Sequence, residues 1–264
     1  MLLTAGCSFV WGDELEGFDQ DPPTHWDKTF TAILAKKLDI EYSNRGFCGA
    51  CNDKIFRETI DFLHSHPHKD DITHLVVMWS AWQRKEVVEY MPADRDVKIG
   101  RQIDVTQFSQ LRTETIYDKN IRTAYTDLFD NAYDSKTDIM HTFSKMKALE
   151  LICDAAGIQL IQGVFHSRNW SNIMSILTDQ HPDDSSAKIS EKEFLIDSIP
   201  EYKKWLKDSI GSLKDTSRIG LGRGKDLFTI CKSIDDMREF GHPGEKSQVI
   251  FADLLHELFA KNSQ

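Results

Sequence analysis

The sequence lacks most features that mark membrane, secreted or nucleic-acid-binding proteins. Its 264 residues include no apolar run long enough to span a bilayer. The start, Met1–Cys7, has neither the basic residues nor the long apolar core of a secretory signal. Lys and Arg number 32 against 42 Asp and Glu, and this net charge of −10 argues against unassisted binding to nucleic acid or an anionic membrane. Five cysteines are an odd number, so a closed disulfide framework is not expected and a reducing, cytoplasmic setting fits better.

No internal repeat or low-complexity linker divides the chain, so we predict one domain over residues 1–264. Strand-like apolar runs alternate with segments whose apolar residues recur at helical spacing, which is typical of a doubly wound α/β sandwich. The clearest strand is Thr73–Ser80, whose nearly continuous apolar run indicates burial on both faces, as in a parallel sheet. Two charged, irregular stretches are too long for simple connections and are interpreted as insertions at about 84–135 and 166–224. Further strands are predicted at the N-terminus and at 40–44, 158–165 and 227–231, which makes about five; helices are predicted at 24–38, 55–63, 138–156 and 201–213 and from Pro243 onward.

The first strand ends at once in Gly6-Cys7-Ser8-Phe9-Val10-Trp11-Gly12. Glycine tolerates backbone angles that a side chain forbids, so this turn can present the Ser8 hydroxyl. The carboxyl ends of strands are also where open α/β sheets keep their chemistry. An ordinary buried turn is the alternative, because Gly-x-Ser alone is not specific.

A second motif, Glu239-Phe240-Gly241-His242-Pro243, lies about twenty residues before the C-terminus and precedes a helical segment. Together, the two ends of the chain resemble the SGNH (GDSL) hydrolase family. The resemblance implies a flavodoxin-like, three-layer α/β/α sandwich with Ser8 as the nucleophile and His242 as its base. It also implies an orienting acid three residues before the histidine, which here is Glu239 where the family has Asp. Competing acids for that role are Asp235 and Asp236.

The resemblance further implies an oxyanion hole, a set of donors aimed at the charge that develops during acyl transfer. The Ser8 N–H is the first donor, and the Gly49 N–H is the second, from a turn similar to the family's second block. The family's third donor is the asparagine of a Gly-x-Asn-Asp block, and the stretch that begins at Trp79 has none. The Ser80 hydroxyl is our candidate replacement, with Trp82 and Arg84 as alternatives. Losing one such donor costs about two to three orders of magnitude in rate.

The hypothesis from the sequence is a serine-dependent acyl hydrolase, an esterase or glycan O-deacetylase. It would act on a small-molecule or glycan ester through an acyl-enzyme, without metal or organic cofactor. One alternative is a catalytically weakened SGNH fold that serves as a binding or assembly module, which the missing asparagine favours. Another is a thiol-redox protein that uses the C-x-x-C pair Cys48 and Cys51, although small buried thiols are the simpler interpretation of these residues. The compact form with a Trp-Ser third block is also similar to SGNH-like proteins encoded by phages.

Overall fold

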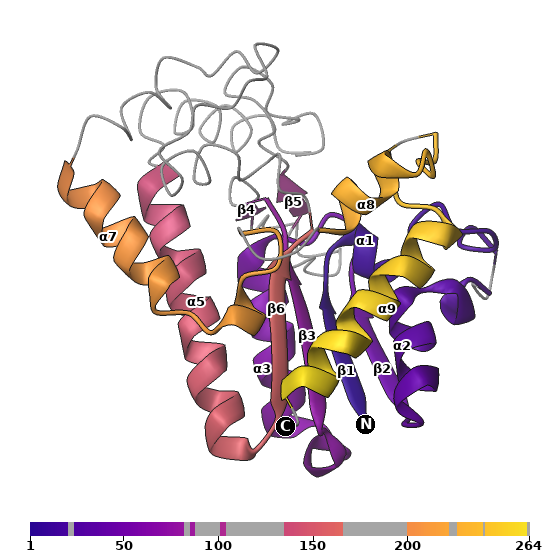
Figure 1. The fold of residues 1–264 in the computed structure, drawn as a ribbon, viewed down its shortest axis with the longest axis horizontal. Helices are drawn as coiled ribbons and strands as arrows, with labels where there is room; N and C mark the ends of the chain where they lie inside the picture. The colour runs from indigo at the N-terminus through magenta and orange to yellow at the C-terminus, as the bar shows by residue number, and fades with distance from the viewer. Residues whose placement is uncertain are drawn as a thin grey trace, which may run out of the picture.

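The computed structural model describes residues 1–20, 24–81, 85–87, 101–103, 135–165, 200–221, 226–239 and 241–262 of the chain. Within these ranges, four parallel strands form a central sheet in the order β2-β1-β3-β6 (Figure 1). They are β1 (Leu2–Gly6), β2 (Tyr42–Gly46), β3 (His74–Trp79) and β6 (Gln159–Val164). The parallel α/β architecture that the alternating pattern predicted is confirmed. A short antiparallel pair, β4 (Lys85–Val87) and β5 (Arg101–Ile103), falls inside the first predicted insertion, most of which lies outside the described residues.

Helices cover both faces of the sheet and make three layers (Figure 1). On one face, α2 (Phe30–Leu38) packs against α9 (Glu245–Asn262), where Phe30 and Phe251 have ring centroids 5.2 Å apart. On the other face lie α3 (Asn52–Ser65) and α5 (Ser135–Ala156), joined by a hydrogen bond from Asn52 Nδ2 to Thr142 Oγ1 (3.1 Å). This division follows from right-handed crossovers that run in one direction across the sheet from β1 to β2, and in the other direction from β2 to β3 and from β3 to β6. The remaining elements are α1 (Ser8–Trp11), α7 (Pro200–Gly211), α8 (Leu227–Ser233) and the 3₁₀ turns η1 (Trp26–Lys28), η2 (Lys69–Asp71) and η6 (Asp215–Ser217).

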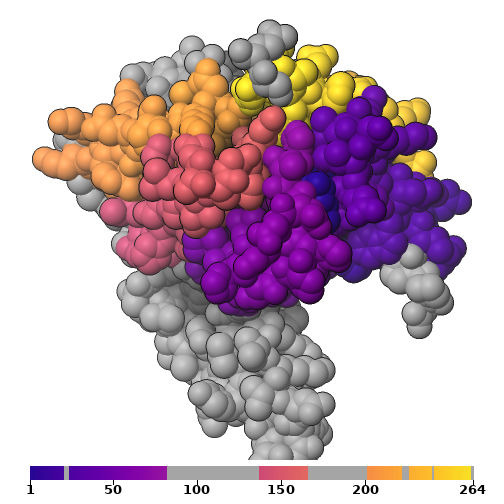
Figure 2. Space-filling view, turned by 90° about the horizontal axis from the view of Figure 1, so that it is seen from below, coloured from indigo at the N-terminus to yellow at the C-terminus, as the bar shows by residue number. Residues whose placement is uncertain are grey.

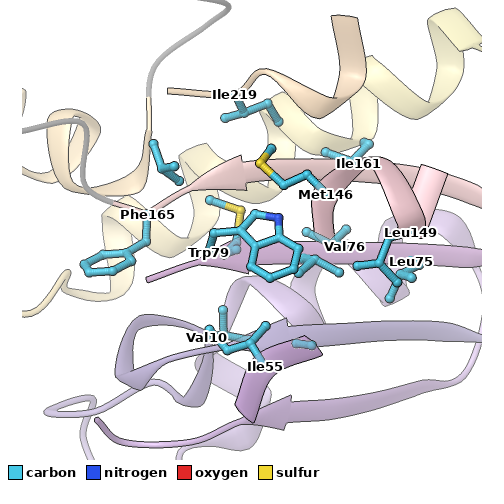
Figure 3. Close-up of a cluster of buried hydrophobic side chains, with 14 of the residues drawn as sticks. Val10, Ile55, Leu75, Val76, Trp79, Met146, Leu149, Ile161, Phe165 and Ile219 are labelled. Atoms are coloured by element: carbon cyan, nitrogen blue, oxygen red, sulfur yellow. The ribbon is translucent and has the colours of Figure 1, made fainter. Parts of the chain in front are cut away.

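The core on the α5 face is organised around Trp79 at the end of β3 (Figure 3). The Trp79 indole is fully buried, and its Nε1 donates a hydrogen bond to Gln162 Oε1 on β6 (3.1 Å). Gln162 Nε2 in turn donates to the Met146 carbonyl (3.0 Å) and to Ser217 Oγ (3.1 Å). Each donor of this buried pair therefore has an acceptor, which removes the cost of burying it.

The prediction of a strand over 227–231 is wrong, because this segment forms the helix α8 (Leu227–Ser233). Asp226 caps the helix by accepting a hydrogen bond from the Thr229 N–H (2.9 Å). Leu227, Ile230 and Cys231 are buried, at the spacing of one helical face. Next to β6, the chain instead forms a single parallel β-bridge between Gly163 and Ile219. The sheet in the described residues therefore has four strands, where about five were predicted.

The two edges of the sheet differ in character. Both chain termini lie at the edge where the strands begin (Figure 1), and Figure 2 looks onto that edge, with α2 on one side and α5 and α7 on the other. Leu2 and Leu3 are fully buried there. Among the described helices, none combines the length and apolar character needed to cross a membrane. The opposite edge, where the strands end, carries α1 and α8 and both predicted catalytic motifs (Figure 1).

Candidate active site

Ser8 lies where the chain leaves β1 and starts the four-residue helix α1. As the first residue of a helix, Ser8 has a backbone N–H without a partner inside that helix. The helix ends at Gly12, whose left-handed φ of 86° is the conformation in which glycine has little steric cost. The Gly12 N–H closes the turn by donating to the Ser8 carbonyl (2.9 Å). The motif thus forms a tight strand-to-helix turn that presents Ser8 at the carboxyl edge of the sheet.

The end of β2 holds this turn in place. A Cβ on Gly46 would lie 2.3 Å from the Trp11 nitrogen, so only glycine allows β2 to approach α1 this closely. Asn44 Nδ2 donates to the Val10 carbonyl (2.7 Å), and Asn44 Oδ1 accepts from the Gly46 N–H (2.8 Å). The position of Ser8 is therefore fixed by backbone packing and by one asparagine.

His242 lies in the loop between α8 and α9, and Asp236 closes this loop. Asp236 Oδ2 accepts from the Ser247 N–H (2.7 Å) and the Ser247 hydroxyl (2.8 Å), which caps the first turn of α9. The Asp236 carbonyl accepts from the Gly244 N–H (2.7 Å), and the His242 carbonyl accepts from the Arg238 N–H (2.9 Å). One of the competing acids considered from the sequence, Asp236, thus hydrogen-bonds to the start of α9 and shapes the loop that carries His242.

The structure brings Ser8 and His242 together across 234 positions of sequence. The Ser8 Oγ and His242 Nε2 atoms are 3.0 Å apart. On the other side of the imidazole, Nδ1 is 2.6 Å from Glu14 Oε2, which also accepts from the His242 backbone N–H (3.1 Å). The Phe9 ring meets the imidazole edge to face at 5.3 Å between centroids. A hydroxyl, an imidazole and a carboxylate therefore lie in hydrogen-bonded sequence.

The carboxylate at Nδ1 belongs to Glu14 and not to Glu239, the residue predicted from the motif. Glu239 is exposed, whereas the Glu14 side chain is only 10% exposed. The Glu14 backbone is left-handed, with φ of 63°. Such a conformation in a residue other than glycine costs on the order of 1–3 kcal/mol and is found where the surrounding structure imposes it. The only sequence signal was the acidic pair that directly follows Gly12.

A second carboxylate, that of Asp13, approaches the same imidazole. Asp13 Oδ2 is 3.5 Å from His242 Nε2, the nitrogen that faces Ser8. The Asp13 side chain is 23% exposed, against 18% for His242, while Ser8 is nearly buried. Of these side chains, Asp13 is the one most open to an incoming molecule.

The predicted oxyanion donors follow the two strands that flank β1. Gly6 is paired with Gly46 on one side and with Met78 on the other, so Gly49 and Ser80 both lie beyond the same edge as Ser8. Gly49 occupies an exposed turn. The Ser80 backbone N–H donates to Asn52 Oδ1 (2.8 Å). The buried Ser80 hydroxyl has no hydrogen-bond partner among the described residues. The alternatives Trp82 and Arg84 lie outside the part of the chain that the structure describes.

The five cysteines are all unbridged. Cys51 is buried at the start of α3, as expected, but Cys48 is exposed, because it lies on the turn that precedes that helix. Burial raises the pKa of the Cys153 thiol to about 12. Across the described ranges, no group of three His, Cys, Asp or Glu side chains is placed to hold a metal ion.

The fold and the site together define an α/β protein with a Ser–His–carboxylate arrangement at the carboxyl edge of a parallel sheet. The family model described as a family of unknown function (DUF6071) matches residues 18–150, and the chain belongs to this family. A comparison with curated proteins gives no match.

The comparison with solved structures gives matches that include the following two. A candidate lipolytic protein of the G-D-S-L family from Desulfitobacterium hafniense shares 9% identity over 97% of both chains, with a TM-score of 0.45. The psychrotrophic esterase EstA from a Pseudoalteromonas species, inhibited by monoethylphosphonate, shares 12% identity over 98% of this chain and 96% of its own, with a TM-score of 0.43. These values establish no activity for this chain and do not bear on the resemblance to phage proteins.

Proposed function

We propose that this protein is a serine-dependent acyl hydrolase of the SGNH type, with Ser8 as the nucleophile and His242 as the base. The observation that carries the proposal is the 3.0 Å contact between Ser8 Oγ and His242 Nε2. A serine hydroxyl is a weak nucleophile until a base within hydrogen-bond reach takes its proton. The opposite ring nitrogen meets a carboxylate, which completes the three roles of a catalytic triad.

Glu14 takes the role that the sequence motif gave to Glu239. An ionised carboxylate only accepts hydrogen bonds, so Nδ1 donates to Glu14 Oε2 and Nε2 is left unprotonated toward Ser8. The same oxygen accepts from the His242 backbone N–H, which fixes the carboxylate relative to the loop as well as to the ring. Glu14 thereby holds the tautomer that general-base catalysis needs and stabilises the imidazolium that forms.

The reaction has two halves. Ser8 Oγ attacks the ester carbonyl carbon while its proton passes to His242 Nε2; the bond to the alcohol oxygen then breaks, and Nε2 returns the proton to that oxygen. Water next gives a proton to Nε2 and attacks the acyl-enzyme, the bond to Ser8 Oγ breaks, and Ser8 recovers its proton. The developing oxyanion would receive hydrogen bonds from the Ser8 N–H, the Gly49 N–H and the Ser80 hydroxyl. The Ser80 N–H is not available for this, because it is bound to Asn52.

A fluorophosphonate probe tests the proposal, because it phosphonylates only an activated serine. We expect the wild-type protein to be labelled at Ser8, and Ser8→Ala and His242→Ala to lose labelling. Ser144→Ala, which removes an exposed serine on α5, is the matched control and should be labelled like wild type. A folded wild-type protein that the probe leaves untouched would remove the hydrolase proposal.

A binding or assembly module is the second candidate function. It is favoured by the missing third-block asparagine and by the engagement of the Ser80 amide with Asn52. On this alternative the Ser–His contact is retained without an oxyanion hole strong enough for catalysis. Absence of labelling in the folded protein would support it.

A further inference from the structure

Asp13 lies beside the nitrogen through which the proposed reaction moves its proton. In that reaction, His242 Nε2 hands a proton to the leaving-group oxygen, so this oxygen must come within about 2.6–3.2 Å of Nε2. Asp13 Oδ2 is 3.5 Å from the same nitrogen. The carboxylate is therefore no more than about 6.7 Å from the leaving-group oxygen when the bond breaks.

Among the described residues, no Lys or Arg forms an ion pair with Asp13. Lys28 is paired with Glu16 (2.6 Å) and Glu245 (3.4 Å), and Arg238 also lies near Glu245 (3.8 Å). Within the described residues, His242 is the ion-pair partner of Asp13, and it is charged only when protonated. Before the substrate gives up its alcohol, the described groups beside Nε2 therefore contribute negative charge through Asp13.

We propose that Asp13 determines leaving-group specificity, so that the site prefers esters whose alcohol part carries a cationic group close to the ester oxygen and rejects those with an anionic group there. The inference rests on the proposed function, because it assumes that Nε2 protonates the leaving group. Opposite charges at this separation attract each other, and the attraction is stronger in a partly desolvated site than in bulk water. For a side chain that is 23% exposed, we expect about a tenfold preference.

Two phosphonate probes that differ only in their leaving group test this inference. One releases thiocholine, which carries a quaternary ammonium; the other releases 3,3-dimethylbutanethiol, its neutral isostere. Phosphonylation of Ser8 is followed by intact-protein mass spectrometry. The measured quantity is the second-order rate constant for the thiocholine probe divided by that for the neutral probe. We expect a ratio of about ten in wild type and about one in Asp13→Asn. Asp19→Asn removes the same charge from an exposed position on the same segment and should keep the wild-type ratio.

The outcomes separate the inference from the proposed function. If neither probe modifies wild type, the hydrolase proposal itself fails. If both probes modify Ser8 and the ratio is the same in wild type and Asp13→Asn, the role of Asp13 is refuted while the hydrolase proposal stands. If Asp13→Asn does not fold, the same ratio of rate constants is measured in wild type at increasing salt concentrations to test the role of Asp13. A ratio that falls as salt screens the carboxylate supports the inference, and a ratio unaffected by salt overturns it.

Discussion

The assignment of Glu14 as the orienting acid makes the sharpest prediction, because the sequence motif points to a different residue. Glu14→Gln keeps the size of the side chain and an oxygen that can accept from His242, but it removes the negative charge. Glu239→Gln makes the same chemical change at the exposed position that the motif favours. The two variants therefore differ only in which carboxylate is lost.

Glu14 Oε2 accepts two hydrogen bonds from His242, one from Nδ1 at 2.6 Å and one from the backbone nitrogen at 3.1 Å, and the expected loss of rate follows from the first. A hydrogen bond to a charged group contributes about 1.5–3 kcal/mol, against about 0.5–1.5 kcal/mol for a neutral one. Only the Nδ1 bond strengthens when the imidazolium forms, so loss of the Glu14 charge weakens support of the transition state by about 1–1.5 kcal/mol. Since about 1.36 kcal/mol corresponds to tenfold in rate, Glu14→Gln should slow the reaction about 5- to 13-fold.

The assay is the second-order rate constant for fluorophosphonate labelling of Ser8, with the thermal unfolding midpoint as a check on folding. We expect Glu14→Gln to be slowed by the factor above and Glu239→Gln to stay within about twofold of wild type, the range expected of a surface substitution. A wild-type rate in Glu14→Gln, or a large loss in Glu239→Gln, would refute the assignment and return the orienting role to the motif acid.

Four further predictions follow, two on the supports of the site and two on the cysteines. Asp236→Ala removes two hydrogen bonds to Ser247 and should lower the free energy of unfolding by about 1–2 kcal/mol in a urea titration while slowing labelling. Gly46→Ala places a Cβ 2.3 Å from the Trp11 nitrogen and should abolish labelling, whereas Gly211→Ala, which meets no atom within 4 Å, should not. At pH 8, iodoacetamide should alkylate exposed Cys48 but not buried Cys153 in the folded protein. The pKa of Cys153 is raised from 9.0 to about 12, so its contribution to stability should fall as pH rises between these values, because the unfolded chain loses that proton first.

Most of the fold could be predicted because strands and helices differ clearly in pattern. The strand predicted over 73–80 is β3 at His74–Trp79, since a short, continuous apolar run bounded by polar residues has few other solutions. The secondary-structure prediction was wrong where a segment is short. Residues 227–231 can be placed as a strand or as one helical turn, and the capping side chain of Asp226, not the apolar pattern, decides for the helix.

The predicted start of the helix at 24–38 shows the same limit. Thr24 and Thr29 are both acceptable N-caps, and the structure uses Thr29, whose hydroxyl accepts from the Ala32 N–H. Trp26–Lys28 forms a 3₁₀ turn before it. Local sequence therefore located the helix but could not choose between two equivalent caps.

The pairing of Ser8 with His242 could be anticipated from the two end motifs, but the acid could not. The position of an orienting carboxylate depends on backbone angles, and a left-handed φ at a glutamate is set by the surrounding fold rather than by the residue itself. Asp236 lies closer to His242 in sequence, yet its carboxylate is committed to the start of α9. Spacing along the chain thus predicted the loop that carries the histidine but not which carboxylate that histidine meets.

The distribution of backbone strain supports a functional origin for the Glu14 contact. Three residues other than glycine have positive φ in the described chain: Glu14, Asp39 and Asp235. Asp39 ends α2, where a left-handed residue is common and needs no further cause. The other two belong to the segments that meet at the site, the turn after Ser8 and the turn before the His242 loop. Glycine at position 14 would remove the strain but would have no carboxylate, and that of Glu14 lies 2.6 Å from the imidazole. The strained backbone at Glu14 thus lies at the residue whose carboxylate our proposal makes the orienting acid.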